Sequence, residues 1–292
     1  METATPTYKA LVLLAALVAA LASAGQARSY GWPVKPFNRQ HPVRSYLGDP
    51  RIGAGATGAV SSSLHFGIDI SAPNGTLVYS VSSGRIRLHP LHPTEVVMVE
   101  SGGVTYEYWH IVPAVSSGYA VAYKTVLGRI AAPWAHVHFS ERHGSTFYNP
   151  LRPGALAPYR DPTVPVVRGL RVQRDPEVGV DLVADAFDTT PMAVAAPWSG
   201  KPVTPALVEW RVRRAGTAPS RWTVAVDFRT TLPALSFSTV YGQGTSQNRA
   251  STVGDYRFVL ARHWQGAGRY VLDVRVADTA GNAAIRSLAF AL

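Results

Sequence analysis

Short runs in which apolar and polar residues alternate fill the chain from Leu64 to the middle of the sequence. These runs, among them GTLVYSVSSG, EVVMVES, VTYEYWHIV and AHVHFSE, are rich in β-branched and aromatic residues, and Gly, Pro, Asn and Ser separate them. A period of two residues with such turn residues between the runs is typical of β-strands. No long segment keeps the period of a helix, so we expect this half of the protein to consist mostly of strands.

Two regions lack this alternation. Residues 30–63 are rich in Pro, Gly and Ser with few regularly spaced apolar residues, which predicts an irregular lead-in that wraps a domain. Residues 149–165 contain five prolines. Because proline is excluded from helix interiors and central strands, this segment is predicted to be an interdomain linker, with the boundary near residue 160.

The residues after the linker predict a second all-β unit. About seven alternating runs follow in about 120 residues, which is the number and spacing of a β-sandwich. The runs are VGVDLVA, LVEWRVRR, WTVAVDF, LSFSTV, YRFVLAR, YVLDVRVAD and AIRSLAFAL. The turn ADTAGNAA, residues 277–284, joins the last two strands and resembles the closing hairpin of bacterial immunoglobulin-like domains. The predicted fold class is therefore all-β throughout.

The beginning of the chain predicts export. Residues 10–27 carry no charge, follow Lys9 and contain the small-residue run ASAG, where a signal peptidase can cut after Ala24 or Ala27. The apolar part is shorter than the roughly 20 residues of a membrane span, although an uncleaved N-terminal anchor is the alternative. We expect a signal peptide over 1–27, domains over 28–160 and 161–292, and a protein that is secreted or held in the cell envelope without a transmembrane span.

Composition narrows the chemistry and the partners. The sequence has no cysteine, so any zinc site must be built from His and carboxylate side chains. The net charge of +10 favours an anionic partner, and for an exported protein an anionic wall polymer fits better than nucleic acid, although solubility alone explains the charge equally well. No basic cluster with interleaved aromatic residues stands out, so we expect no nucleic-acid partner.

Histidine spacing supplies the candidate chemistry. On an extended strand His136 and His138 point to the same face with Cα atoms roughly 6.6 Å apart, so both can approach one ion. His65 and Asp69 are four residues apart, about 13 Å on a straight strand, so sharing an ion requires a bend, which we expect at Gly67. Two imidazoles and one carboxylate would leave a fourth tetrahedral position for water, as in catalytic zinc sites. Spacing alone does not divide the roles of His136 and His138.

These segments together resemble a known family. HFGIDISAPNGTLVYSVSSGRI, then YWHI, then VLGRIAAPWAHVHFSE and NPL look like the zinc endopeptidases of the lysostaphin and LytM type, the peptidase M23 family, which cut peptides in peptidoglycan. The resemblance extends from about Gly31 to Leu151 and preserves the order of the family's motifs. It implies an N-terminal antiparallel β-sheet catalytic domain of the LytM/lysostaphin type, followed here by the immunoglobulin-like β-sandwich.

The resemblance also implies roles for single residues. His65, Asp69 and His138 would ligate Zn²⁺, and His110 and His136 would be the catalytic imidazoles beside a zinc-activated water. The implied function is that of a secreted zinc metalloendopeptidase that hydrolyses cross-links or stem peptides of the cell wall, and we expect a monomer.

Three features leave alternatives open. The passage RIAAPWAHVHF is shorter and more apolar than the Gly, Ser and Thr-rich loop usual before His-x-His in this family, which puts the cleft shape and the bond cleaved in doubt. Asn38 or His41 in the lead-in could reach the metal as a latency device, with surface or turn roles as the default. Two alternative hypotheses for the function remain: a non-catalytic envelope protein that binds peptidoglycan or activates another hydrolase, and a zinc protease for glycine-rich proteins.

Overall fold

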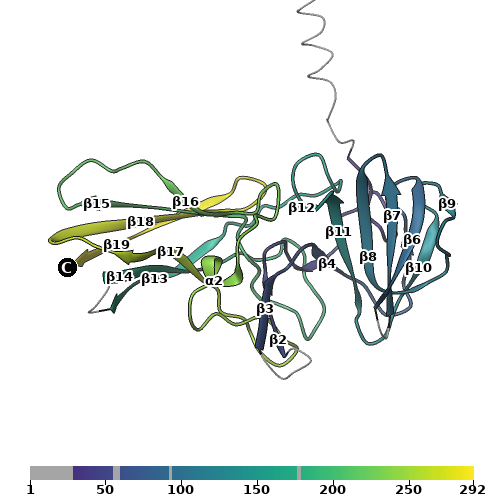
Figure 1. The fold of residues 1–292 in the computed structure, drawn as a ribbon, viewed down its shortest axis with the longest axis horizontal. Coiled ribbons are helices and arrows are strands. Elements are labelled where there is room, and N and C mark those ends of the chain that lie inside the picture. Colours follow the sequence, from purple (N-terminus) through teal and green to yellow (C-terminus); the bar gives the residue numbers. More distant parts are fainter. Residues whose placement is uncertain (1–28, 55–59, 92–93, 176–178) are drawn as a thin grey trace, which may run out of the picture.

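The computed structural model describes residues 29–54, 60–91, 94–175 and 179–292. The expected signal peptide, residues 1–27, lies outside the described residues. Almost all regular structure is β-strand, arranged in antiparallel sheets, which confirms the all-β prediction (Figure 1). Among the described residues no helix has the length and apolar character needed to cross a membrane.

A ten-stranded antiparallel sheet forms most of the first half of the chain. Its longest path runs β1-β4-β11-β8-β7-β6-β9, while β10 joins β5 to β8 and β12 pairs with β11. The strands are β1 (Val43–Ser45), β4 (Ile68–Ser71), β5 (Leu77–Tyr79), β6 (Gly84–Leu91), β7 (Thr94–Ser101), β8 (Val104–Pro113), β9 (Ala120–Val121), β10 (Val126–Ile130), β11 (His136–His143) and β12 (Thr146–Tyr148).

Apolar and polar residues alternate along β4 and β11, which places the hydrophobic core on one face of the sheet and the candidate site on the other. In β11, Val137 and Phe139 are fully buried in the first hydrophobic cluster, so His136 and His138 project from the opposite face of the sheet. In β4, Ile68 and Ile70 enter the same cluster, and Asp69 between them projects to the face of the histidines. The apolar residues thus hold the register that brings the polar residues together.

The lead-in is more regular than expected. Besides β1, residues 30–63 contain β2 (Pro50–Ala54) and most of β3 (Val60–Leu64), which pair as a two-stranded antiparallel sheet. The prediction of an irregular lead-in was therefore wrong in this part. These strands are three to five residues long, too short to display a period, and the serines of β3 face solvent and carry no hydrophobic signal.

Two further antiparallel sheets form the second half of the chain. One has the order β13-β14-β17 and the other β16-β15-β18-β19, and residues of both sheets line one hydrophobic cluster, as in a β-sandwich. Leu182 and Phe258 contribute to it from the first sheet, and Leu272 and Val274 from the second. The strands are β13 (Val166–Asp175), β14 (Gly179–Phe187), β15 (Leu207–Arg214), β16 (Thr223–Asp227), β17 (Arg257–Trp264), β18 (Arg269–Ala277) and β19 (Ala283–Ala291).

Among the described residues of this half the number of strands equals the expected seven, but two assignments differ. The run LSFSTV, expected to be a strand, contains the short helix α2 (Phe237–Val240). The Ser236 side chain accepts a hydrogen bond from the Thr239 amide and so caps the first turn. Strand β13 takes the place of the missing strand and was not expected, because its alternate positions carry Arg and Gly rather than a clear apolar series.

The two halves share packing across the predicted linker. Residues 149–165 contain no regular strand or helix, as their prolines require. Leu47 and Leu64 from the first half nevertheless belong to the second cluster, and Val203 from the second half belongs to the first. The boundary near residue 160 remains a prediction, and the packing on its two sides is continuous.

A buried charged network anchors β11. Glu141 is 1% exposed and accepts hydrogen bonds from Tyr30 at 2.6 Å and from Arg152 at 2.6 Å. Burial opposes ionisation of Glu141, but the hydrogen bonds from Arg152 and Tyr30 outweigh it and lower the pKa of this carboxyl. Nε2 of His143 lies 3.0 Å from Oε1 of the same carboxylate. Burial, together with the charge of Glu141, raises the pKa of nearby Tyr106 to about 12.

Candidate metal centre

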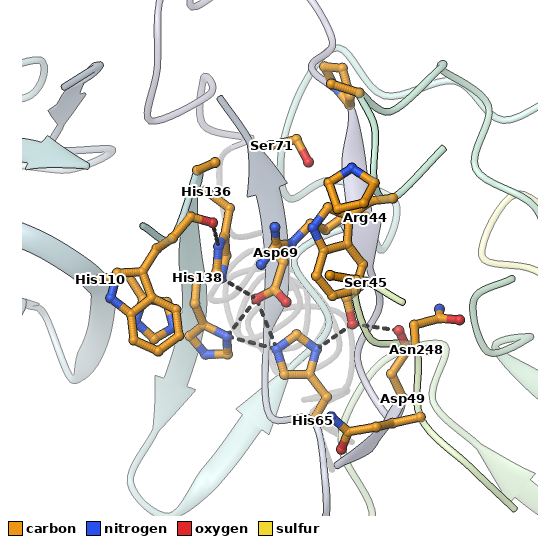
Figure 2. Close-up of a pocket in the computed structure, with 18 of the residues that line it drawn as sticks. Arg44, Ser45, Asp49, His65, Asp69, Ser71, His110, His136, His138 and Asn248 are labelled. Carbon is orange, nitrogen blue, oxygen red and sulfur yellow. Dashed lines mark hydrogen bonds and ion pairs between the residues drawn. The ribbon is translucent and has the colours of Figure 1, made fainter. Parts of the chain in front are cut away.

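Three of the predicted site residues meet where β4 and β11 run side by side. The chain bends at Gly67, between β3 and β4, as expected, and this bend brings His65 beside Asp69. His138 in β11 is the direct partner of Asp69 in β4. Figure 2 shows the side chains of His65, Asp69 and His138 turned toward one another. All three are buried.

The distances among their polar atoms suit a small cation. Nε2 of His65 lies 2.7 Å from Nδ1 of His138, and Oδ1 of Asp69 lies 3.2 Å from the first atom and 3.1 Å from the second. A triangle with these sides has a circumscribed radius of about 1.7 Å, so a point at the usual zinc–ligand distance of roughly 2.05 Å from all three atoms lies about 1 Å above their plane. The group can therefore hold a metal ion.

The outer hydrogen bonds fix the free nitrogen of His65 and allow the matching one in His138. His65 Nδ1 lies 2.9 Å from the Tyr46 carbonyl, which only accepts, so this nitrogen carries the proton and Nε2 presents a lone pair. His138 Nε2 lies 2.8 Å from Ser140 Oγ, a hydroxyl that can accept the proton of Nε2 and so free Nδ1 to face Asp69 as an acceptor. Burial lowers the pKa of both rings, that of His138 to about 4, so both are neutral. Three acceptor atoms thus face one another, an arrangement that a bound cation stabilises.

Arg51 is a site residue that the sequence did not reveal. Its Nη2 donates to Oδ2 of Asp69 at 3.0 Å and to Oγ of Ser45 at 2.8 Å, so it holds the carboxylate with Oδ1 toward the histidines. Burial opposes the charge on Asp69, but its polar neighbours, the charged Arg51 among them, keep the pKa of this carboxyl well below its usual range. Arg51 lies in the lead-in, where no periodic pattern marked it.

The two expected catalytic imidazoles lie beside this group. Nε2 of His136 is 3.5 Å from Oδ1 of Asp69, and its Nδ1 donates to the Trp134 carbonyl at 2.7 Å. The ring centroid of His110 is 4.7 Å from that of His136 (Figure 2). His110 has a φ of 65° at the point where β8 stops pairing with β11 and starts pairing with β10. The structure therefore brings all five predicted residues together.

Trp134 belongs to the apolar passage RIAAPWAHVHF before His-x-His, and its side chain lies in the site. Its ring stacks on that of His110 with centroids 3.9 Å apart and planes 14° from parallel. Nδ1 of His110 is buried and has no hydrogen-bond partner among the described residues. Burial, together with nearby His136, lowers the pKa of His110 to about 3, so this ring is neutral.

The centre opens into a cavity of about 890 Å³ that both halves of the chain line. One wall carries the histidines, and the other includes Trp198, Asn248 and Tyr256 from the second half. The Arg44 guanidinium lies 4.2 Å from the centroid of the Trp198 ring. Arg44 is half-buried and makes no hydrogen bond or ion pair with any described residue, so its N–H groups are available to the cavity. Sequence reasoning missed this wall because its residues are remote along the chain.

Other polar candidates lie elsewhere. Neither Asn38 nor His41 lines the cavity, and His41 Nε2 lies 3.0 Å from the Pro36 carbonyl, so neither reaches the ligand group in this structure. His143 pairs with Glu141 away from the site. Arg44 and Trp198, unlike Asn38 and His41, line the cavity.

Comparisons with known proteins give slight similarity. No family model matches the sequence, and no curated protein matches it. Among solved structures, Helicobacter pylori Csd3 in its orthorhombic crystal has a TM-score of 0.36 and 22% identity over 46% of this chain and 36% of that one. The hexagonal crystal form of Csd3 has a TM-score of 0.27 and 21% identity over 39% and 31%.

A third structure, a candidate peptidase M23 from Pseudomonas aeruginosa, has a TM-score of 0.25 and 20% identity over 48% of this chain and 57% of that one. The chain spans between about a third and three fifths of the length of these proteins. At these TM-scores the likeness is too slight to assign a fold or an activity.

Proposed function

We propose that the protein is an extracytoplasmic zinc metalloendopeptidase that hydrolyses peptide bonds in peptidoglycan. The observation that carries this proposal is the convergence of three acceptor atoms, from His65, Asp69 and His138, at distances that suit one zinc ion. Two further imidazoles beside them, in a cavity large enough for a peptide, favour catalysis over a purely structural ion.

The residues present fit the chemistry of peptide hydrolysis. A zinc ion at this centre would polarise the scissile carbonyl and lower the pKa of a water from about 15.7 toward 7. His136 is held by the Trp134 carbonyl with Nε2 toward the centre, where it can accept or return a proton. His110, neutral and stacked on Trp134, is placed to hydrogen-bond the carbonyl oxygen or the leaving amine.

The cavity wall supports an anionic peptide as substrate. Arg44 brings a guanidinium without a carboxylate partner among the described residues, and this group lies over the ring of Trp198. A guanidinium without a carboxylate partner can donate two parallel hydrogen bonds to the two oxygens of a substrate carboxylate. Wall peptides that carry free carboxylates near the cleaved bond satisfy this requirement, whereas the glycine-rich protein substrates considered above offer no charge for Arg44.

Metal analysis combined with fragment analysis tests the proposal. Purified protein should contain about one zinc ion per chain and release peptide fragments from purified peptidoglycan, detected by mass spectrometry, and a chelator should abolish both. Asp69→Asn should lose zinc and hydrolysis, while Asp227→Asn, at an ion pair with Arg229 remote from the cavity, should keep both. Zinc without hydrolysis would support the binding or activating alternative, and absence of zinc would overturn the metal centre.

A further inference from the structure

A second buried cluster of acidic side chains lies outside the candidate metal centre. Asp161 belongs to the predicted linker, Asp188 follows β14 and Asp278 follows β18. Their exposed fractions are 5%, 1% and 3%. One carboxylate oxygen from each lies within 4.8 Å of the others. Three regions distant in sequence therefore place three carboxylates in one buried volume.

No positive side chain neutralises this cluster. Among the described residues, none of the three forms an ion pair with Arg, Lys or His. Their hydrogen-bond donors are neutral: Tyr159 and Thr163 for Asp161, the Thr189 amide for Asp188, and Asn282 for Asp278.

Oδ2 of Asp188 is buried and has no hydrogen-bond partner among the described residues. Its other oxygen already accepts from Thr189. Burial, together with the neighbouring carboxylates of Asp161 and Asp278, raises the pKa of Asp188 to about 8. An unpartnered carboxylate oxygen at such a place is costly unless a cation or a proton binds it.

We propose that Asp161, Asp188 and Asp278 bind a calcium ion. Carboxylates without nitrogen or sulfur ligands select a hard cation, and calcium takes such oxygens at about 2.3–2.6 Å. Two ligands on opposite sides of a calcium ion are at most about 5 Å apart, and the three oxygens fall within this limit at 4.8 Å. The site is separate from the zinc centre in composition and in place, so it does not depend on the proposed peptidase activity.

The ion would join the linker to the second half of the chain. Asn282 Nδ2 donates to the Asp161 carbonyl at 2.8 Å, and Tyr159, which donates to Asp161, also contacts Tyr46 of the first half. Asp188 pairs through its backbone with Val203, a member of the first hydrophobic cluster. Calcium should therefore stabilise the junction that sets the second wall of the cavity.

Thermal unfolding and calorimetric titration of the full chain test this site. After removal of metals, calcium should bind the wild-type protein with a stoichiometry of one and raise its Tm. Asp188→Asn should abolish both responses, and above pH 8 without calcium it should be at least as stable as the wild type, because it removes a charge that no cation neutralises. Asp227→Asn serves as the matched control, and His138→Ala should keep the calcium response while losing zinc.

Two results would overturn the proposal. One is a wild-type protein whose Tm and heat signal do not respond to calcium up to about 10 mM, which is tenfold above the weakest Kd of about 1 mM for extracellular calcium modules. The other is an Asp188→Asn variant that still responds like the wild type. A Tm that rises only on acidification, without any effect of calcium, would show that a proton occupies the cluster instead.

Discussion

Substitution of Gly67 by alanine tests how the bend between β3 and β4 supports the metal centre. A Cβ atom at this position would lie 2.4 Å from the Phe139 carbonyl oxygen, 2.6 Å from Ser140 Oγ and 2.9 Å from His138 Nε2. All three contacts are shorter than van der Waals contact allows. The nearest atom belongs to the backbone of β11, so it cannot yield by rotation of a side chain, and another belongs to a proposed ligand.

The expected effect has two parts. Forcing one methyl group into a packed interior costs about 1–3 kcal/mol, and each kcal/mol lowers the Tm of a domain of 150–250 residues by about 2–4 °C. Displacing Ser140 and the outer nitrogen of His138 disturbs the hydrogen bond that fixes the ring, and such changes weaken metal binding by about 10- to 100-fold.

Circular dichroism melting and competitive zinc titration measure the two parts separately. Gly53→Ala is the control, because a Cβ there meets nothing nearer than Ser61 Oγ at 3.9 Å. If Gly67→Ala melts and binds zinc like this control, β4 and β11 do not approach as closely as described, and the geometry of the centre is wrong.

The remaining predictions concern catalysis, specificity and pH. His136→Ala should retain zinc while hydrolysis falls by about 10²- to 10⁴-fold, and full hydrolysis would remove this residue from the mechanism. Arg44→Gln should lower kcat/KM about 10- to 100-fold for a peptide with a free carboxylate and leave its amidated analogue unaffected, whereas equal losses on both would contradict the assigned role. Glu141→Gln should destabilise the fold by about 3 kcal/mol at neutral pH in urea unfolding, because it leaves Arg152 without its buried partner. Since folding lowers the pKa of Glu141, its contribution is present above the ordinary pKa of about 4.3 and lost as the pH falls below it, so the difference between variant and wild type should shrink in acid.

Local sequence determined the strand content and the chemistry of the first site. Alternation around Val137 and Phe139 follows from the period of two in a strand, and it placed His136 and His138 on one face before any tertiary contact was known. The bend at Gly67 was predictable because a straight strand separates His65 from Asp69 too far for a shared ion. Local signals failed where they were weak, as in β2 and β3, or misleading, as in α2, where a cap at Ser236 overrode the apolar alternation.

Only the tertiary structure decided which distant residues complete each site. Pairing of β4 with β11 sets Asp69 against His138, and Arg51 reaches Asp69 from a hairpin without a periodic pattern. Trp198 meets Arg44 across 154 positions of sequence, and Asp161, Asp188 and Asp278 become an unneutralised cluster only when two strand ends and a linker come together. Sequence specifies which side chains can bind or react, because that is a property of each residue. Distance, burial and the sum of nearby charges depend on non-local packing, and these quantities decide where such side chains form a site.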